Sequence, residues 1–204
     1  MDINEYLKVK DMTYLEYCDY LQDKYGIGRY DYMTKSWNKN HKCTRTNEGL
    51  ITHHKAEDKM IMLSTKEIAQ KFPFEWQQKE NIIYCDYLEH LLLHVLICIY
   101  PNPNKVPIAD VGIGGVINFI VPELNDLYSG WKTNQVWRQN CHNLVKNDKD
   151  VYLVIMQKFI KYEKRHNRNF AISMLYKSMN DNYGNWEKSN DKLIFKEISA
   201  LDIN

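Results

Sequence analysis

The chain has 204 residues, with 27 Lys and Arg against 26 Asp and Glu, so its formal net charge at pH 7 is +1. Hydrophobic residues make up 44% of it and aromatic residues 13%, which is enough to build a buried core and excludes a disordered chain. The balanced charge excludes attraction to nucleic acid through overall charge, so any phosphate binding must come from local clusters.

Two helices and one strand are predicted in the first part of the chain. Residues 12–25 place aromatic and apolar side chains at helical spacing, and glycines follow. Residues 30–47 have no sustained period, which indicates a loop. Residues 49–54 indicate a short strand with two histidines at its end. A capping-box pattern opens a short helix over residues 64–72, which a proline ends.

A second strand and a long helix follow directly. Residues 80–85 are rich in β-branched and aromatic side chains, and residues 86–100 predict a helix with Asp86 as its cap. The glycines of residues 112–115 indicate a structural turn, because they lack the spacing of a phosphate-binding loop. Helical periodicity continues over residues 116–129, 131–146, 150–166 and 169–180, and residues 190–198 fit a strand or a frayed end.

Four of the seven histidines lie between residues 51 and 94. His90 and His94 are four residues apart in the predicted helix, so they lie on one face and can bind one metal ion together. His53, at the end of the first strand, is the candidate third ligand. Three protein ligands leave positions open for water and substrate, as a catalytic metal site requires.

His54 and Asn81 are expected to act beside the metal. Adjacent histidines at a strand end can reach one site with different tasks, one binding metal and the other transferring protons. An amide does not titrate near neutral pH, so Asn81 is expected to hold backbone by hydrogen bonds. Glu57 and Asp58 could support the metal ligands, although a solvated loop is the expected place for both, and His142 is expected on the surface. The alternative for a single histidine such as His90 is a structural place in the core.

These residues resemble a known family. The order His-His, Asn, His-x-x-x-His, with Asn81 nine positions before His90, is similar to the HNH (His-Asn-His) endonucleases of the ββα-metal superfamily. Residues 50–54 look like the first strand of that family, and residues 80–94 look like its second strand and metal-binding helix. Two features depart from the pattern: zinc-knuckle cysteines are absent, and 26 residues separate the histidine pair from Asn81.

The resemblance implies a role for each matching residue. His53, His90 and His94 would be metal ligands, His54 the general base, and Asn81 the residue that braces the histidine-bearing loop. The implied reaction is hydrolysis of phosphodiester bonds in DNA by a histidine-activated water beside one divalent metal ion, with zinc, manganese, nickel and magnesium as candidates. Imidazole ligands favour the transition metals over magnesium.

Two other functions stay open. A ribonuclease-type toxin would use the same chemistry, so RNA is the alternative substrate to DNA. A non-enzymatic phage or host-conflict interaction protein could use the same scaffold with a structural metal or none. Cutting both DNA strands with one metal centre per chain would call for a homodimer or for two successive nicks.

The predicted fold is α+β and mostly helical, with a small ββα-metal core. Residues 1–34 form an N-terminal helical segment, residues 35–100 the HNH-like core, and residues 101–204 a helical region for DNA contact or dimerisation. Two basic clusters could touch phosphate, although solvated surface is the alternative for each. The clusters are Lys35, Lys39, Lys42 and Arg45, and Lys158, Lys161, Lys164, Arg165 and Arg168.

The expected location is the cytoplasm. The five cysteines are scattered without a C-x-x-C pair, which argues against a disulfide framework and favours a reducing compartment. The N-terminus lacks the basic and apolar regions of a secretory signal. The longest apolar run, residues 95–100, is far shorter than the roughly 20 residues that span a bilayer, so no membrane association is expected.

Overall fold

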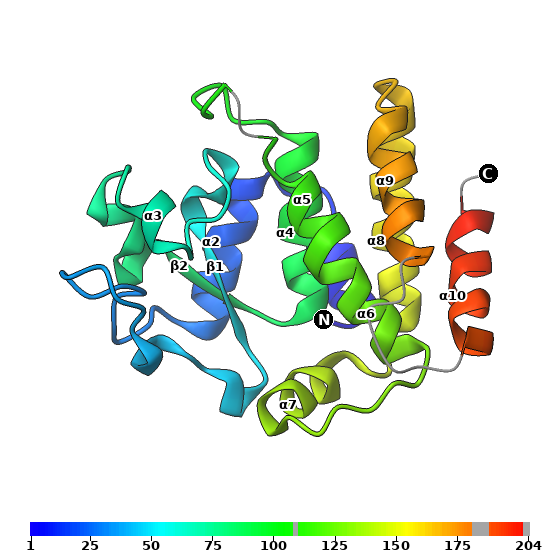
Figure 1. Cartoon of the computed structure of the whole chain (residues 1–204), viewed down its shortest axis with the longest axis horizontal. Helices are drawn as coiled ribbons and strands as arrows, with labels where there is room; N and C mark the ends of the chain where they lie inside the picture. Colours follow the sequence, from blue (N-terminus) through cyan, green and yellow to red (C-terminus); the bar gives the residue numbers. More distant parts are fainter. Residues whose placement is uncertain (108–109, 181–187, 202–204) are drawn as a thin grey trace.

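The computed structural model describes residues 1–107, 110–180 and 188–201. It is a mostly helical α+β structure, as predicted, and its described residues contain one two-stranded antiparallel sheet (Figure 1). The sheet lies on one side of the central helix α4, and the C-terminal helices lie on the other. Within the described residues, no helix has both the length and the apolar character needed to cross a bilayer.

Two helices open the chain, α1 (Ile3–Val9) and α2 (Tyr14–Tyr25). A capping box starts α2, because the Thr13 side chain accepts from the backbone of Glu16 while the Glu16 carboxylate accepts from the backbone of Thr13. Gly26, at φ 74°, ends it. The sequence predicted α2 but not α1, which is too short to show a sustained period.

The sheet pairs β1 (Ile51–His54) with β2 (Ile82–Cys85) in an antiparallel register that sets His53 opposite Ile83 and His54 opposite Ile82. Because side chains alternate along a strand, His53 and Ile83 share the face that packs on the main core. His54 lies on the other face with Ile82, which packs in a small second core.

The segment between the strands is made of short turns. They are the 3-10 turns η3 (Lys55–Asp58), η4 (Phe74–Gln77) and η5 (Lys79–Asn81) and the four-residue helix α3 (Lys66–Ala69). The predicted helix over residues 64–72 is therefore only one turn long. The predicted second strand begins two residues late, because residues 80 and 81 belong to η5.

Helix α4 (Tyr87–Ile99) is buried along nearly its whole length. Asp86 and Glu89 form a capping box at its start, as the sequence indicated for Asp86. A helix that is apolar all round must be covered on every side. Helix α2 and the sheet cover one side of α4, and α8 covers another.

The C-terminal half is helical, as predicted. It comprises α5 (Ile113–Gly115), the π-helical turn η6 (Val116–Ile120), α6 (Val121–Tyr128), α7 (Val136–Val145), α8 (Lys149–Arg165), α9 (Asn169–Asn180) and α10 (Lys188–Ala200). Residues 190–198 were expected as a strand or frayed end and are instead part of α10. Ile194 and Ile198, one helical turn apart, are both buried in the main core, which explains the helix.

Candidate metal centre

The three predicted ligands meet in the structure. His53 comes from the end of β1, and His90 and His94 come from successive turns of α4. Candidate ligand atoms on the three side chains all lie within 4.8 Å of one another, and His53 and His94 are buried. A buried His53, His90 and His94 cluster can therefore hold one metal ion.

A hydrogen bond sets the orientation of the His53 ring. Its Nε2 lies 2.9 Å from the Tyr14 hydroxyl, which also lies 3.0 Å from the carbonyl oxygen of Lys55. Because a carbonyl can only accept, Tyr14 donates to Lys55 and accepts from His53 Nε2–H. The lone pair of His53 is then on Nδ1, a buried atom with no hydrogen-bond partner among the described residues.

The His94 ring is fixed in the same way. Its Nδ1 lies 3.2 Å from the carbonyl oxygen of Gly112 and must donate to it, so the lone pair is on Nε2. That Nε2 lies 3.2 Å from Nε2 of His90. Fixing the second ring nitrogen by a carbonyl or other acceptor is the usual support of a metal-binding histidine. Two independent supports thus turn the lone pairs of His53 Nδ1 and His94 Nε2 into the cluster, where His94 Nε2 accepts from His90 Nε2–H.

Burial keeps the imidazoles of His53 and His90 neutral. Desolvation lowers the pKa of His53 to about 3, and desolvation, followed by the charge of His94, holds the pKa of His90 well below its usual range. The neutral imidazole is the form that binds a metal ion. The donor set therefore fits a transition metal of the kind that the sequence predicted.

Glu57 is the unexpected member of the site. Its Oε2 lies 3.3 Å from His94 Nε2 and 3.6 Å from His53 Nδ1, and its Oε1 lies 3.6 Å from His54 Nδ1. The expectation of a solvated loop is wrong, because η3 turns the chain back over the histidines directly after β1.

His54 faces the same carboxylate from the other side of the strand end. Its Nε2 lies 3.1 Å from Oε1 of Gln77, whose Nε2 donates to the carbonyl oxygen of Leu63 over 3.1 Å. Because Nε2 of Gln77 donates to Leu63, its Oε1 is the acceptor for His54. His54 therefore donates through Nε2, and the lone pair of its ring is on Nδ1. Tyr32 packs edge-on against the ring, with centroids 4.4 Å apart. Sequence patterns gave no signal for Gln77 or Tyr32.

Asn81 lies outside the histidine cluster. Its Nδ2 donates to the carbonyl oxygen of Glu75 over 2.9 Å and so closes the turns that precede β2. The amide thereby holds the end of the segment that connects the two strands. Glu75 lies in the segment before β2 and not in the loop that carries His53 and His54, so the role that the resemblance implied for Asn81 stays a prediction.

The glycine-rich turn before η6 supports the site from the C-terminal half. Gly112, at φ 87°, presents its carbonyl to His94. A Cβ at Gly115 would lie 2.2 Å from Cε1 and Nδ1 of the His94 ring, so only glycine leaves room there. The turn was predicted to be structural, and the structure adds that it packs directly on a candidate ligand.

His142 lies away from the cluster and is buried, which corrects the expectation of a surface residue. Its Nε2 lies 2.5 Å from Oε1 of Glu123, and Glu123 also pairs with Arg138. The pair links α6 to α7. Its role is to hold these two helices together.

Comparison of the chain with protein-family models, with curated proteins and with solved structures found no match. The site is therefore interpreted from its own geometry.

Proposed function

We propose that the protein is a metal-dependent endonuclease that hydrolyses phosphodiester bonds in DNA. One observation carries the proposal: separate hydrogen bonds fix three rings so that the lone pairs of His53 Nδ1 and His94 Nε2 lie in the cluster, and the lone pair of His54 Nδ1 faces Glu57 beside it. Such fixed tautomers are what a metal site with an adjacent general base needs.

Each residue has a task in this reaction. A divalent ion held by His53, His90 and His94 would stabilise negative charge on the phosphate and on the leaving oxygen. His54 Nδ1 takes the proton of the attacking water. Gln77 accepts from His54 Nε2–H before and after that transfer, and so keeps the ring in place. Zinc, manganese and nickel suit three imidazoles better than magnesium does.

A second function is favoured by the position of Glu57. If its carboxylate joins the three histidines on the ion, the site has four protein ligands, which is typical of a structural zinc site rather than a catalytic one. The chain would then be a non-enzymatic interaction protein with a metal-stabilised core.

A plasmid-nicking assay with manganese, nickel or zinc, with and without chelator, separates the two functions when metal content is measured beside it. We expect the wild type to nick DNA only with metal. His54→Ala should lower the rate by about 10²–10⁴-fold and retain metal, whereas His94→Ala should lose both. His166→Ala, at an exposed histidine outside the site, is the control.

Wild-type cleavage by His54→Ala would contradict the assignment of the base. Bound metal without cleavage of DNA would favour the structural function, and cleavage of an RNA substrate alone would replace DNA by RNA.

A further inference from the structure

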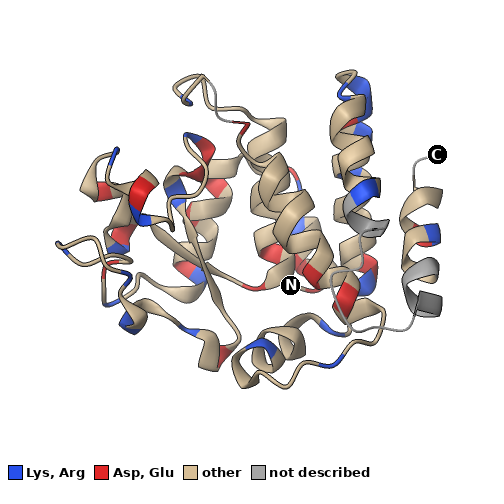
Figure 2. Ribbon diagram, in the orientation of Figure 1, with Lys and Arg blue, Asp and Glu red and all other residues tan. Residues whose placement is uncertain are grey.

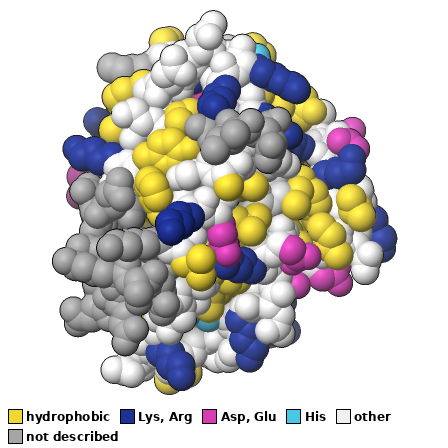
Figure 3. Space-filling view, turned by 90° about the vertical axis from the view of Figure 1, so that its right-hand side faces the viewer, with side chains coloured by type: hydrophobic (Ala, Val, Ile, Leu, Met, Phe, Trp, Pro, Cys, Tyr) yellow, Lys and Arg dark blue, Asp and Glu magenta, His cyan; other side chains and the backbone are white. Residues whose placement is uncertain are grey.

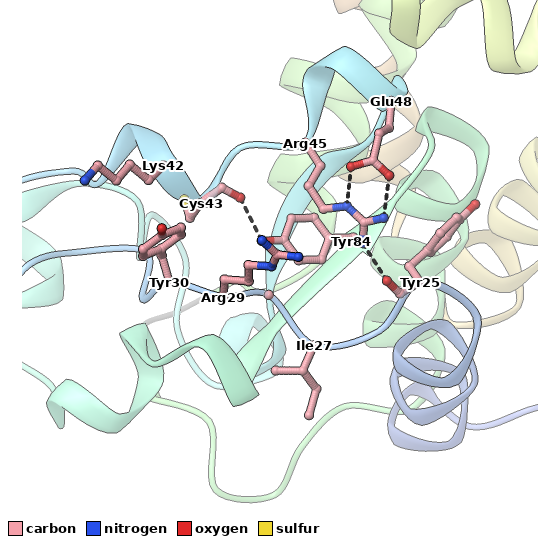
Figure 4. A pocket seen from close by; sticks show the side chains of 10 residues that line it. Tyr25, Ile27, Arg29, Tyr30, Lys42, Cys43, Arg45, Glu48 and Tyr84 are labelled. Atoms are coloured by element: carbon pink, nitrogen blue, oxygen red, sulfur yellow. Dashed lines mark hydrogen bonds and ion pairs between the residues drawn. The ribbon is translucent and has the colours of Figure 1, made fainter.

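A pocket of about 340 Å³ lies beside the sheet, between the loop that follows α2 and the segment that leads into β1 (Figure 4). Its lining carries three cationic side chains, three tyrosines and one carboxylate. These are Arg29, Lys42, Arg45, Tyr25, Tyr30, Tyr84 and Glu48. None of them belongs to the metal centre, and the proposed reaction does not use them.

One wall of the pocket is held rigidly. The Arg45 guanidinium donates to both carboxylate oxygens of Glu48 and to the carbonyl oxygen of Tyr25, and it stacks 4.8 Å from the centroid of the Tyr84 ring. The Tyr84 hydroxyl donates to the carbonyl oxygen of Cys43 over 2.7 Å. Arg45 is thus already neutralised, and it shapes the wall instead of offering a free charge.

The rim of the pocket carries two cationic side chains. Arg29 and Lys42 are exposed, and no carboxylate pairs with either of them within the part of the chain that the structure describes. Tyr30, 45% exposed, lies below Lys42, with Nζ 5.8 Å from its ring centroid. Two unpaired cations beside an open aromatic face suit a phosphate group and a base that belong to one nucleotide.

The pocket and the proposed base lie on the same face of the hairpin. Tyr84 is two residues from Ile82, the partner of His54, and alternation puts both side chains on the face away from α4. Ile82, between the proposed base and Tyr84 on this face, is buried in the small second core, and the metal ligands lie on the opposite face, toward α4.

We propose that this pocket binds one unpaired nucleotide of the nucleic-acid substrate. Arg29 and Lys42 hold its phosphate, and Tyr30 stacks on its base. The volume is near the lower end of the roughly 300–1,000 Å³ of small-ligand pockets, so it fits one nucleotide and not a duplex. This assignment rests on the proposed function.

The test measures binding, not cleavage. Full-length His54→Ala protein is titrated with a fluorescent single-stranded 12-mer at several salt concentrations, alone and with Arg29→Glu and Lys42→Glu added. Losing two phosphate contacts should weaken binding and reduce the slope of log affinity against log salt by about 1.4, at about 0.7 for each contact. Lys177→Glu with Lys196→Glu, the same charge change on α9 and α10, should leave the slope unchanged.

A second variant tests the stacking. Tyr30→Leu should weaken binding of the 12-mer about tenfold and leave binding of a 12-mer made only of abasic sites unchanged. Thermal melting of each variant checks that the fold is intact.

The outcomes separate the two proposals. Equal affinity and slope for the pocket variant and the parent would overturn the nucleotide site, whatever the nicking assay shows. Binding that depends on the pocket, in a wild-type protein that cuts no nucleic acid with any metal, would overturn the endonuclease and leave the site in place. A mononucleotide that competes as well as the 12-mer would show that the pocket takes free nucleotides rather than a strand.

Discussion

The Glu57 carboxylate stands between the candidate ligands and the candidate base. Its two oxygens contact His53 and His94 on one side and His54 on the other, all at 3.3–3.6 Å. A bound ion would attract this carboxylate more strongly than neutral imidazoles do. Glu57 is thus placed either to bind the ion directly or to hold the water that His54 activates.

We expect Glu57→Gln to weaken metal binding by about 10–100-fold, the range seen when a charged partner of a metal site is lost. The glutamine keeps the size of the side chain and removes its charge. Competition with a chromophoric chelator measures the affinity, and Glu67→Gln on exposed α3 is the control. Unchanged affinity would place Glu57 outside the metal's coordination and assign it to the water.

The histidines of the site were predictable because local rules decide their placement. Spacing of four in a helix puts His90 and His94 on one face, and His53 comes from the neighbouring strand. Glu57, Gln77 and Tyr14 could not be predicted in the same way. Their contacts depend on where the connecting turns and α2 return to the sheet, and short-range pattern does not carry that information.

At the scale of elements, α4 carries two ligands, and the glycine turn between it and η6 holds one of them in place. Gly115 and Gly114 form a natural pair for testing this. A Cβ at Gly115 would meet the His94 ring at 2.2 Å, whereas a Cβ at Gly114 would meet its nearest neighbour, Asn118 Nδ2, at 3.8 Å.

Gly115→Ala should therefore push the His94 ring out of place, lower the free energy of unfolding by about 1–3 kcal/mol and weaken metal binding. Gly114→Ala should leave metal binding unchanged and could stabilise the short helix by up to about 1 kcal/mol. Chemical denaturation and metal titration measure both effects. Equal behaviour of the two variants would show that the turn does not position His94.

The ion pairs of Glu123, which join α6 to α7, make a pH-dependent contribution to the free energy of unfolding. Burial raises the pKa of Glu123, but the hydrogen bonds of His142 and Arg138 lower it by more, so its pKa in the folded chain is below the ordinary 4.5. A lowered pKa means that the contribution to stability is complete above about pH 4.5 and is lost as the pH falls through the folded-state value.

Glu123→Gln should accordingly lower the free energy of unfolding at pH 7 by about 1.5–3 kcal/mol, the range for hydrogen bonds to charged groups. The difference from wild type should shrink below pH 4.5, where the unfolded carboxyl is protonated. Urea unfolding between pH 3.5 and 8 measures it, beside exposed Glu75→Gln. A difference that does not change with pH would mean that packing, not charge, holds the two helices.

At the scale of the whole molecule, acidic and basic side chains are intermixed over most elements, in keeping with the balanced composition (Figure 2). The face that carries the C-terminal helices also mixes apolar patches with charges of both signs (Figure 3). Four of the five residues of the second predicted basic cluster, Lys158, Lys161, Lys164 and Arg165, are on α8, across α4 from the sheet (Figure 1), and Arg168 follows the end of that helix. Its contact with DNA stays a prediction, and it would use a different surface from the pocket.

The three predicted segments share one core. A single cluster of buried side chains includes Tyr17 of α2, Leu92 of α4 and Phe159 of α8, and continues to Ile198 of α10. The fold class was predictable because helical periodicity is strong in each half. The way in which the two halves pack on each other was not predictable, because α4 is apolar all round and its pattern does not show which elements cover it.

The shared core predicts that the HNH-like segment does not fold alone. A chain of residues 1–107 would keep both strands and α4 but lose α8, which packs on α4, and the glycine turn that holds His94. Removing those elements exposes a large apolar surface on a helix that is buried along nearly its whole length, and such a surface favours aggregation over a stable monomer. We expect this fragment to show no cooperative thermal unfolding and rapid proteolysis, while the full chain melts in one transition that metal shifts upward. Circular dichroism and limited proteolysis of both chains, with and without zinc, measure this. If the fragment unfolds cooperatively and binds zinc as tightly as the full chain, residues 1–107 are an independent domain and the C-terminal half is an appendage to the site.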